Sequence, residues 1–324
     1  MSNYIIETEN LTKQYDSLVA VDKLNLTIEE GELFGLLGPN GAGKSTTLLT
    51  LTTILKPTSG RATVGGFDIV LQPSLVRKSI GIVFQDPSSD DTLTGYENLK
   101  LHGMLYGMPV RLREERIREV LELVDLTDRK DELVKRYSGG MRRRLEIARG
   151  LMHHPRVLFL DEPTLGLDPQ SRENIWQYIE NLSKEEHISL ILTTHYMEEV
   201  DRLCDRLAIM DEGKIVALGT PAELKRIIGG DVVVMKASTP DMEALGELGY
   251  VKHIEKKDGI ISLTVVSANE HLPEILQKTG KVDSVEIHSP TLNDVFLHFT
   301  GREIRDESPE GGWGQKTMNY RAKK

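Results

Sequence analysis

The stretch GLLGPNGAGKST at residues 35–46 decides how this sequence is expected to fold. It fits the pattern G-x-x-x-x-G-K-[ST] from Gly38 to Ser45, after an apolar run and before a helix-like run. The three glycines let a loop wrap closely around an anion and turn its N–H groups inward. This strand–loop–helix context predicts a phosphate-binding loop in an α/β sheet.

The side chains of this loop suit a nucleotide bound with Mg²⁺. Lys44 would reach the outer phosphates as a point charge, Ser45 would ligate Mg²⁺, and Thr46 would lie at the α-phosphate end. A glycine-rich turn without function is the alternative, and the strand–loop–helix context makes it the weaker one. The residues predicted to surround the phosphates are Gly38, Pro39, Asn40, Gly41, Ala42, Gly43, Lys44, Ser45 and Thr46.

A pair of carboxylates ends the apolar run VLFLDEP at residues 157–163. Asp161 would hold Mg²⁺, and Glu162 would act as the general base that activates water. A merely charged strand end is the competing interpretation, and a phosphate loop elsewhere in the chain weakens it.

Three further polar residues lie at predicted strand ends or turns. His195 ends ISLILTTH, Gln85 closes IGIVFQ, and Tyr15 lies in a predicted hairpin. Each alone is ambiguous, because such a histidine is more often structural and a lone tyrosine is usually a packing residue. Open α/β sheets bind ligands at their strand ends, which favours a shared site.

A second glycine-rich helix start, YSGGMRRRLEIARG at residues 137–150, places a serine before two glycines. Such a start presents backbone N–H groups to an anion. It lacks the lysine and the Mg²⁺-ligating hydroxyl of the first loop, so it is not expected to hold a nucleotide alone. The basic run Arg142–Arg144 is expected to form a solvated or subdomain-facing surface.

Composition narrows the class of protein. The 324 residues suit two domains, and no apolar run approaches the ~20 residues that a membrane helix needs. The single cysteine, Cys204, and the absence of a signal-peptide pattern lead us to expect a cytosolic protein. The net charge of −10 argues against nucleic acid as a partner.

The patterns predict two folded domains and a tail. Alternating short strands at residues 4–36 and continuous apolar strands further on predict a parallel sheet in a domain of residues 1–226. Residues 86–153 are expected to form a helical subdomain within it. Residues 227–301 follow a β-α-β-β-α-β order, which resembles a ferredoxin-like unit. The polar tail, residues 302–324, is expected to be disordered.

Taken together, these motifs resemble the nucleotide-binding subunits of ABC transporters over residues 4–224. The motifs of that family occur here in its order: Tyr15, GPNGAGKST, Gln85, YSGGM, VLFLDEP, GLDP and His195. Within that family, the run YSGGMRRRLEIARG, the segment DDTLTGYENL and the ending PTLNDVFLHFTGREIRDE resemble the drug-resistance subgroup, similar to the daunorubicin/doxorubicin exporter ATPase. The one departure is YSGGM, where the family consensus begins with Leu and ends with Gln.

The resemblance implies a fold, and it implies roles for residues that the patterns left open. It implies a RecA-like core, an antiparallel β-subdomain and an α-helical subdomain. Tyr15 would stack on adenine, Gln85 would touch Mg²⁺ and the attacking water, and His195 would hold the γ-phosphate. Residues of a second copy would complete each ATP site across a homodimer, namely Ser138, Gly139, Gly140 and Asp168.

The resemblance also implies a function at the membrane. ATP binding and hydrolysis would drive a separate ABC-2 type permease, which would hold the chain at the cytoplasmic face of the membrane. Three alternatives stay open: a soluble ABC ATPase with a mechanical role, an ATP-binding scaffold without turnover, and an importer subunit. The transported compound is not expected to be readable from this chain, because the permease selects it.

Overall fold

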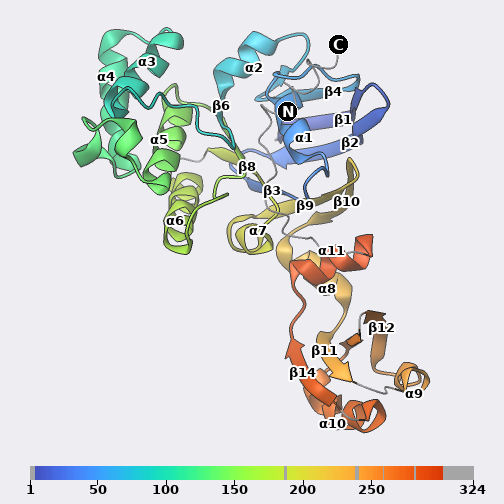
Figure 1. Cartoon of the computed structure of the whole chain (residues 1–324). Helices are drawn as coiled ribbons and strands as arrows, with labels where there is room; N and C mark the ends of the chain where they lie inside the picture. The colour runs from blue at the N-terminus through green and yellow to red at the C-terminus, as the bar shows by residue number, and fades with distance from the viewer. Residues whose placement is uncertain (1–3, 186–187, 238–240, 258, 281, 302–324) are drawn as a thin grey trace. The chain divides into compact units, whose positions relative to one another are not determined.

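The computed structural model describes residues 4–185, 188–237, 241–257, 259–280 and 282–301 (Figure 1). The predicted tail, residues 302–324, lies outside them. The described residues up to Leu218 form one compact unit, and those from Gly219 to Gly301 form another. This division precedes the boundary predicted at residues 226 and 227, because helix α8 (Pro221–Ile228) packs on helix α11 (Leu292–Thr300).

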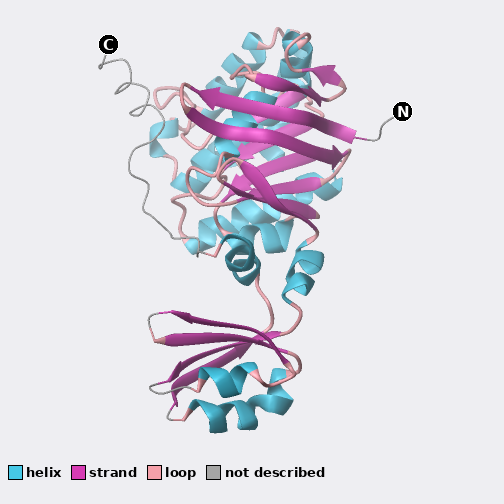
Figure 2. Cartoon of the chain, turned by 90° about the vertical axis from the view of Figure 1, so that its right-hand side faces the viewer, coloured by secondary structure: helices cyan, strands magenta, loops and turns pink. Residues whose placement is uncertain are grey.

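The first unit begins with a twisted antiparallel sheet in the strand order β2-β1-β4-β5. Its apolar side chains alternate along the strands, so that one face joins the core, as the period of two requires. In Figure 2 its strands are the long arrows that lie nearest the labelled N-terminus. Its strands are β1 (Tyr4–Tyr15), β2 (Leu18–Glu29), β4 (Ser59–Val64) and β5 (Phe67–Asp68).

A second sheet of six strands, in the order β10-β9-β3-β8-β7-β6, forms the centre of the unit. Strands β6, β7, β8, β3 and β9 pair in parallel in that order. Every residue of β3, β7 and β8 is buried, which explains their continuous apolar runs. The strands are β3 (Leu33–Leu37), β6 (Ile80–Val83), β7 (Val157–Asp161), β8 (Ser189–Thr194), β9 (Arg206–Asp211) and β10 (Lys214–Gly219).

Helices connect these strands, and a helical insertion lies between β6 and β7 as predicted. Its first helix begins with a capping box in which Thr94 and Glu97 satisfy each other's backbone N–H groups. The insertion holds α3 (Gly95–Leu105), α4 (Val110–Leu123), the 3₁₀ turns Thr127–Arg129 and Val134–Arg136, and α5 (Gly139–Leu151). The other helices are α1 (Lys44–Leu51), α2 (Pro73–Ser79), α6 (Pro169–Glu185) and α7 (Met197–Leu203).

Helix α1 is shorter than its sequence suggests. The run KSTTLLTLTTIL predicts a helix to Leu55, but the helix ends at Leu51. Thr53 adopts a φ of +65°, in the left-handed region that stops a right-handed helix. Propensity alone does not place this end, because threonine is tolerated on both sides of it.

The second unit has the β-α-β-β-α-β order that the sequence predicts. Its antiparallel sheet has the strand order β12-β13-β11-β14, and two helices cover one face of that sheet (Figure 2). Its core is formed by apolar residues such as Val233, Leu263 and Ile275. The elements are β11 (Asp231–Ala237), α9 (Met242–Gly246), β12 (Val251–Lys257), β13 (Ile260–Val265), α10 (Ala268–Thr279) and β14 (Val282–His288). No helix within the described residues is long and apolar enough to cross a membrane.

Candidate nucleotide-binding and catalytic site

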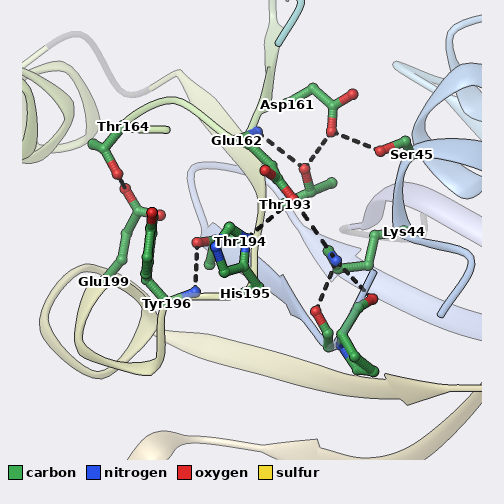
Figure 3. Close-up of polar contacts among 12 residues, drawn as sticks. Lys44, Ser45, Asp161, Glu162, Thr164, Thr193, Thr194, His195, Tyr196 and Glu199 are labelled. Carbon is green, nitrogen blue, oxygen red and sulfur yellow. Dashed lines mark hydrogen bonds and ion pairs between the residues drawn. The ribbon is translucent and has the colours of Figure 1, made fainter. Parts of the chain in front are cut away.

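Three adjacent parallel strands end at one edge of the central sheet, and each delivers a predicted site residue there. The phosphate loop follows β3, Asp161 ends β7, and His195 directly follows β8. Figure 3 shows Lys44, Glu162 and His195 pointing toward one another from these three segments. The sheet therefore brings together residues that are far apart in the sequence.

The phosphate loop has the backbone that its glycines permit. Gly43 has a φ of +102°, and a Cβ added there would lie 2.4 Å from the Ala20 carbonyl oxygen. A residue with a side chain would be strained at this position and would clash. The Lys44 ammonium donates hydrogen bonds to the carbonyl oxygens of Gly38 at 2.7 Å and Pro39 at 3.0 Å. The lysine thus lies over its own loop.

Two hydroxyl groups hold the carboxylate of Asp161. Ser45 Oγ donates to Asp161 Oδ1 at 3.1 Å, and Thr193 Oγ1 donates to the same oxygen. Burial raises the pKa of Asp161, while these two hydrogen bonds lower it. Carboxylate and hydroxyl oxygens are the ligands that Mg²⁺ prefers, so Ser45 and Asp161 form a donor set that fits this ion.

Glu162 has an unusual backbone and a shared carboxylate. Its φ of +46° is strained for a residue other than glycine, and its N–H donates to the Thr193 carbonyl at 3.0 Å and hydroxyl at 3.1 Å. Glu162 Oε1 lies 3.3 Å from His195 Nδ1 and 3.9 Å from the Lys44 ammonium. Burial raises the pKa of Glu162, but the hydrogen bond with His195 and the charge of Lys44 outweigh it, so that the net shift is downward. An ionised carboxylate in this position can accept a proton from water.

Lys44 is also shaped by its surroundings. Its side chain is only 4% exposed, and burial lowers the pKa of its ammonium. The carboxylates of Glu162 and Asp161 act in the opposite direction. Two carboxylates and one ammonium in a buried site create a field that can orient phosphate groups and a metal ion.

Tyr15 and Gln85 lie at the margins of this cluster. The Tyr15 hydroxyl is buried without a hydrogen-bond partner among the described residues. Burial raises the pKa of Tyr15, and the Thr46 side chain acts in the opposite direction. Gln85 lies two residues beyond the end of β6 and is half-buried.

The second glycine-rich start lies apart from the first. Ser138 is exposed and caps α5 by accepting a hydrogen bond from the Met141 N–H at 3.2 Å. Asp168 is exposed as well and caps α6 by accepting from the Ser171 N–H at 3.0 Å. No hydrogen bond within the part of the chain that the structure describes joins Ser138 or Asp168 to Lys44 or Glu162.

The glycine pair of the second start packs against the segment that carries Asp168. A Cβ added to Gly139 would lie 3.3 Å from the Leu167 side chain. A Cβ added to Gly140 would lie 3.0 Å from Ser171 Oγ. Two exposed features that the sequence separates by about thirty residues therefore form one surface of the chain.

The three arginines of the basic run on α5 have different surroundings. Arg142 pairs with Asp91 and Arg144 with Asp125, both from the helical insertion, as a subdomain-facing surface would. Of the two predicted surfaces, solvated or subdomain-facing, only the second fits Arg143, which is 6% exposed and faces the ends of β6 and β7. A buried arginine needs partners for its donors, and Arg143 finds three backbone carbonyls.

Arg143 ties three segments of the site together. Its guanidinium donates to the carbonyl oxygens of Phe84, Asp161 and Pro163, at 2.5 to 2.9 Å. Burial lowers its pKa to about 10, which still leaves it charged. The signal was present in the sequence, because Arg143 precedes the buried Ile147 by four residues and so shares its helix face.

Thr193 is the second residue that the sequence analysis missed. Its hydroxyl donates to Asp161 and accepts from the Glu162 N–H, so that it orients the carboxylate of Asp161 and holds the backbone of Glu162. In the sequence it is one of two threonines before His195. The alternation of side chains along β8 does not tell which of the two lies beside Asp161 of β7. Only the pairing of Asp161 with Thr193 across the parallel strands identifies it.

The fold and the site together define an ATP-binding cassette. Its phosphate loop, carboxylate pair and histidine lie at the edge of a parallel sheet, and the unit also has an antiparallel sheet and a helical insertion. The ABC transporter family matches residues 21–165, and the C-terminal domain of DrrA1-3-like ATP-binding proteins matches residues 219–300. The chain belongs to the ABC transporter family, as an ATP-binding subunit that hydrolyses ATP.

The curated relatives match nearly the whole chain. The daunorubicin/doxorubicin resistance ATP-binding protein DrrA of Streptomyces peucetius is 40% identical over 314 residues, which cover 94% of this chain and 95% of the relative. The linearmycin resistance ATP-binding protein LnrL of Bacillus subtilis is 37% identical and covers 93% of this chain and 100% of its own. The Nod factor export ATP-binding protein I of Cupriavidus metallidurans is 39% identical, with coverage of 93% and 99%. These names support a subunit of an exporter and do not favour a soluble mechanical ATPase.

Solved structures match the first unit. The structure of cbiO1 from Clostridium perfringens, part of the ABC transporter complex cbiONQ, has a TM-score of 0.65 at 33% identity and covers 70% of this chain and 94% of its own. A dimeric ATP-binding cassette in a post-hydrolysis state, bound to ADP and Pi, has a TM-score of 0.60 at 28% identity and covers 66% and 98%. These similarities confirm the predicted fold class.

Proposed function

We propose that the chain powers the export of drugs or other hydrophobic compounds, as a homodimer that closes on ATP and drives a separate ABC-2 type permease. The observation that carries the proposal is the cluster in which one oxygen of Glu162 meets both His195 and Lys44 beside the phosphate loop. The names of the relatives supply the class of cargo.

The loop residues would bind the phosphates. The N–H groups of the loop would face the phosphate oxygens, and Lys44 would exchange its carbonyl partners, Gly38 and Pro39, for the outer phosphates. Ser45 and Asp161 would hold Mg²⁺, which neutralises charge on the phosphates when it is bound. Tyr15 would stack on adenine, and Gln85 would lie by the metal and the attacking water.

Glu162 would take the proton from the attacking water. The water oxygen would form a bond to the γ-phosphorus while the bond from that phosphorus to the bridging oxygen breaks and ADP leaves. His195 Nδ1 would keep the Glu162 carboxylate oriented, and its ring would contact the γ-phosphate. Burial of the site makes these fixed charges effective, because little water competes with them.

A second copy of the chain would complete each site. Ser138, Gly139 and Gly140 are a capped helix start at the surface, without the lysine and metal ligands of a full nucleotide site. The dipole and free N–H groups of α5 favour an anion there, which suits the γ-phosphate held by another copy. Asp168, on the same surface, would lie at the junction of the two copies.

The permease would hold the chain at the cytoplasmic face of the membrane and would respond to the segment after Gln85.

The cargo can be tested in cells that lack the chain but keep its permease. We expect the wild-type chain to restore growth on at least one hydrophobic drug and Glu162→Gln to fail at equal expression. Equal rescue by both would contradict transport driven by hydrolysis.

A further inference from the structure

Two parallel bridges join the turn after β7 to the segment after β8. The first is the contact of Glu162 with His195, described above. Two residues beyond Glu162, Thr164 Oγ1 donates a hydrogen bond of 2.9 Å to Glu199 Oε1, and Glu199 lies four residues beyond His195 (Figure 3). The same two segments are therefore fixed to each other at two points.

The second bridge lies entirely in the interior. Thr164 and Glu199 are both 0% exposed, and Glu199 Oε1 also accepts a hydrogen bond of 3.0 Å from Trp176 Nε1 on α6. Within the described residues, Glu199 Oε2 has no hydrogen-bond partner. A buried carboxyl is costly, and the hydrogen bonds from Thr164 and Trp176, together with the nearby Thr194 side chain, offset part of that cost.

The position of the bridge gives it a further consequence. Glu162 has a strained backbone, with a φ of +46°, and such a conformation persists only when the surroundings hold it. On its N-terminal side, the Thr193 carbonyl and hydroxyl hold the Glu162 N–H. On its C-terminal side, the Arg143 guanidinium holds the Pro163 carbonyl, and Thr164 is the next residue held, through its own hydroxyl. Glu199 in turn lies in the first turn of α7, directly after the segment of His195.

We infer that Thr164 and Glu199 are positioning residues that set the alignment of Glu162 with His195. The inference rests on the proposed roles of Glu162 and His195 in hydrolysis. Among the described residues, neither Thr164 nor Glu199 forms a hydrogen bond with the phosphate loop, so the bridge acts on turnover through the first bridge and has little effect on ATP affinity. A purely structural bridge would instead affect stability alone.

The test is a double-mutant cycle on the full-length chain that combines Thr164→Val and His195→Ala. Steady-state phosphate release, measured over a range of ATP concentrations with excess Mg²⁺, gives the maximal rate and the KM for ATP of each variant. We expect Thr164→Val to lower the rate about five- to tenfold, as the loss of one buried hydrogen bond implies, with KM for ATP changed less than about twofold. In the His195→Ala background the same substitution should lower the rate less than about twofold, because the alignment that it supports is already lost.

Conservative variants distinguish the loss of this hydrogen bond from a general loss of structure. Thr164→Ser keeps the donor and should restore at least half of the rate. Glu199→Gln keeps an oxygen that can accept from both donors, so it should lose less than Glu199→Leu. Thr279→Val, in the second unit, is the matched control: its hydroxyl is buried and bonds only carbonyls of its own helix, so the rate should not change.

Two outcomes would overturn the inference. One is a Thr164→Val variant with the wild-type rate. The other is an equal loss with and without His195, which would indicate a structural role alone. Glu162→Gln serves as the reference: if that variant keeps its turnover, the proposed function itself fails, whereas an inactive Glu162→Gln with an additive cycle removes only this inference.

Discussion

Glu162 and His195 meet at 3.3 Å across the ends of two neighbouring parallel strands, although 33 residues separate them in the sequence. The contact joins a carboxylate on a strained turn to a ring at the start of a different segment. It is one of two links between the turn after β7, which follows the proposed Mg²⁺ ligand Asp161, and the segment that leads into α7. The proposed hydrolysis of ATP depends on this pair.

The first prediction concerns the helix start at Ser138, Gly139 and Gly140, which is proposed to complete the ATP site of a second copy of the chain. Ser138→Arg places a long cation on the exposed start of α5, where it would block the approach of a second copy. We expect ATPase activity to fall at least about a hundredfold, because the proposed closure of the dimer would have to precede hydrolysis, while a fluorescent ATP analogue binds nearly as in the wild type. Loss of nucleotide binding would instead assign this segment to the pocket of its own chain.

The buried guanidinium of Arg143 leads to the second prediction. Arg143→Met leaves the carbonyls of Phe84, Asp161 and Pro163 without their donors, so the free energy of unfolding should fall by about 3 kcal/mol. Urea unfolding measures this change. Arg142→Met, on the same helix, loses only a partly exposed ion pair with Asp91 and should cost less than about 1 kcal/mol. Equal costs for the two variants would contradict the bridging role of Arg143.

The third prediction is that acid lowers the free energy of unfolding through His102, in the helical insertion. Burial lowers the pKa of His102 to about 4, and the Arg149 charge adds to this shift. The unfolded chain therefore binds this proton more readily, and stability should fall as the pH drops from about 6.5 to about 4, by up to about 3 kcal/mol. Urea unfolding at several pH values should show a smaller fall for His102→Gln. An identical pH dependence in both proteins would exclude His102 as a cause.

The strands and the phosphate loop could be predicted because local signals agree there. The continuous apolar run before Asp161 and the glycines around Lys44 determine a buried strand and a loop without reference to distant residues. The roles of Arg143 and Thr193 could not be predicted in this way. Their hydrogen bonds reach 18 to 59 residues along the chain, so that only the packed sheet brings the partners together.

The boundary between the two units shows the same limit. Helix α8 carries a strong local start signal, in which Thr220 and Glu223 form a capping box, and the sequence predicts its existence. Which unit it joins depends on its packing against α11, which follows about seventy residues later. Local patterns predict elements, whereas long-range packing assigns them to domains.

The most direct measurement is phosphate release and oligomeric state for Glu162→Gln with ATP and Mg²⁺. The variant keeps the size of the side chain but cannot take a proton from water. We expect a rate at least about a hundredfold below the wild type, and accumulation of an ATP-bound dimer that size-exclusion chromatography resolves. Turnover at the wild-type rate, without such a dimer, would contradict this expectation.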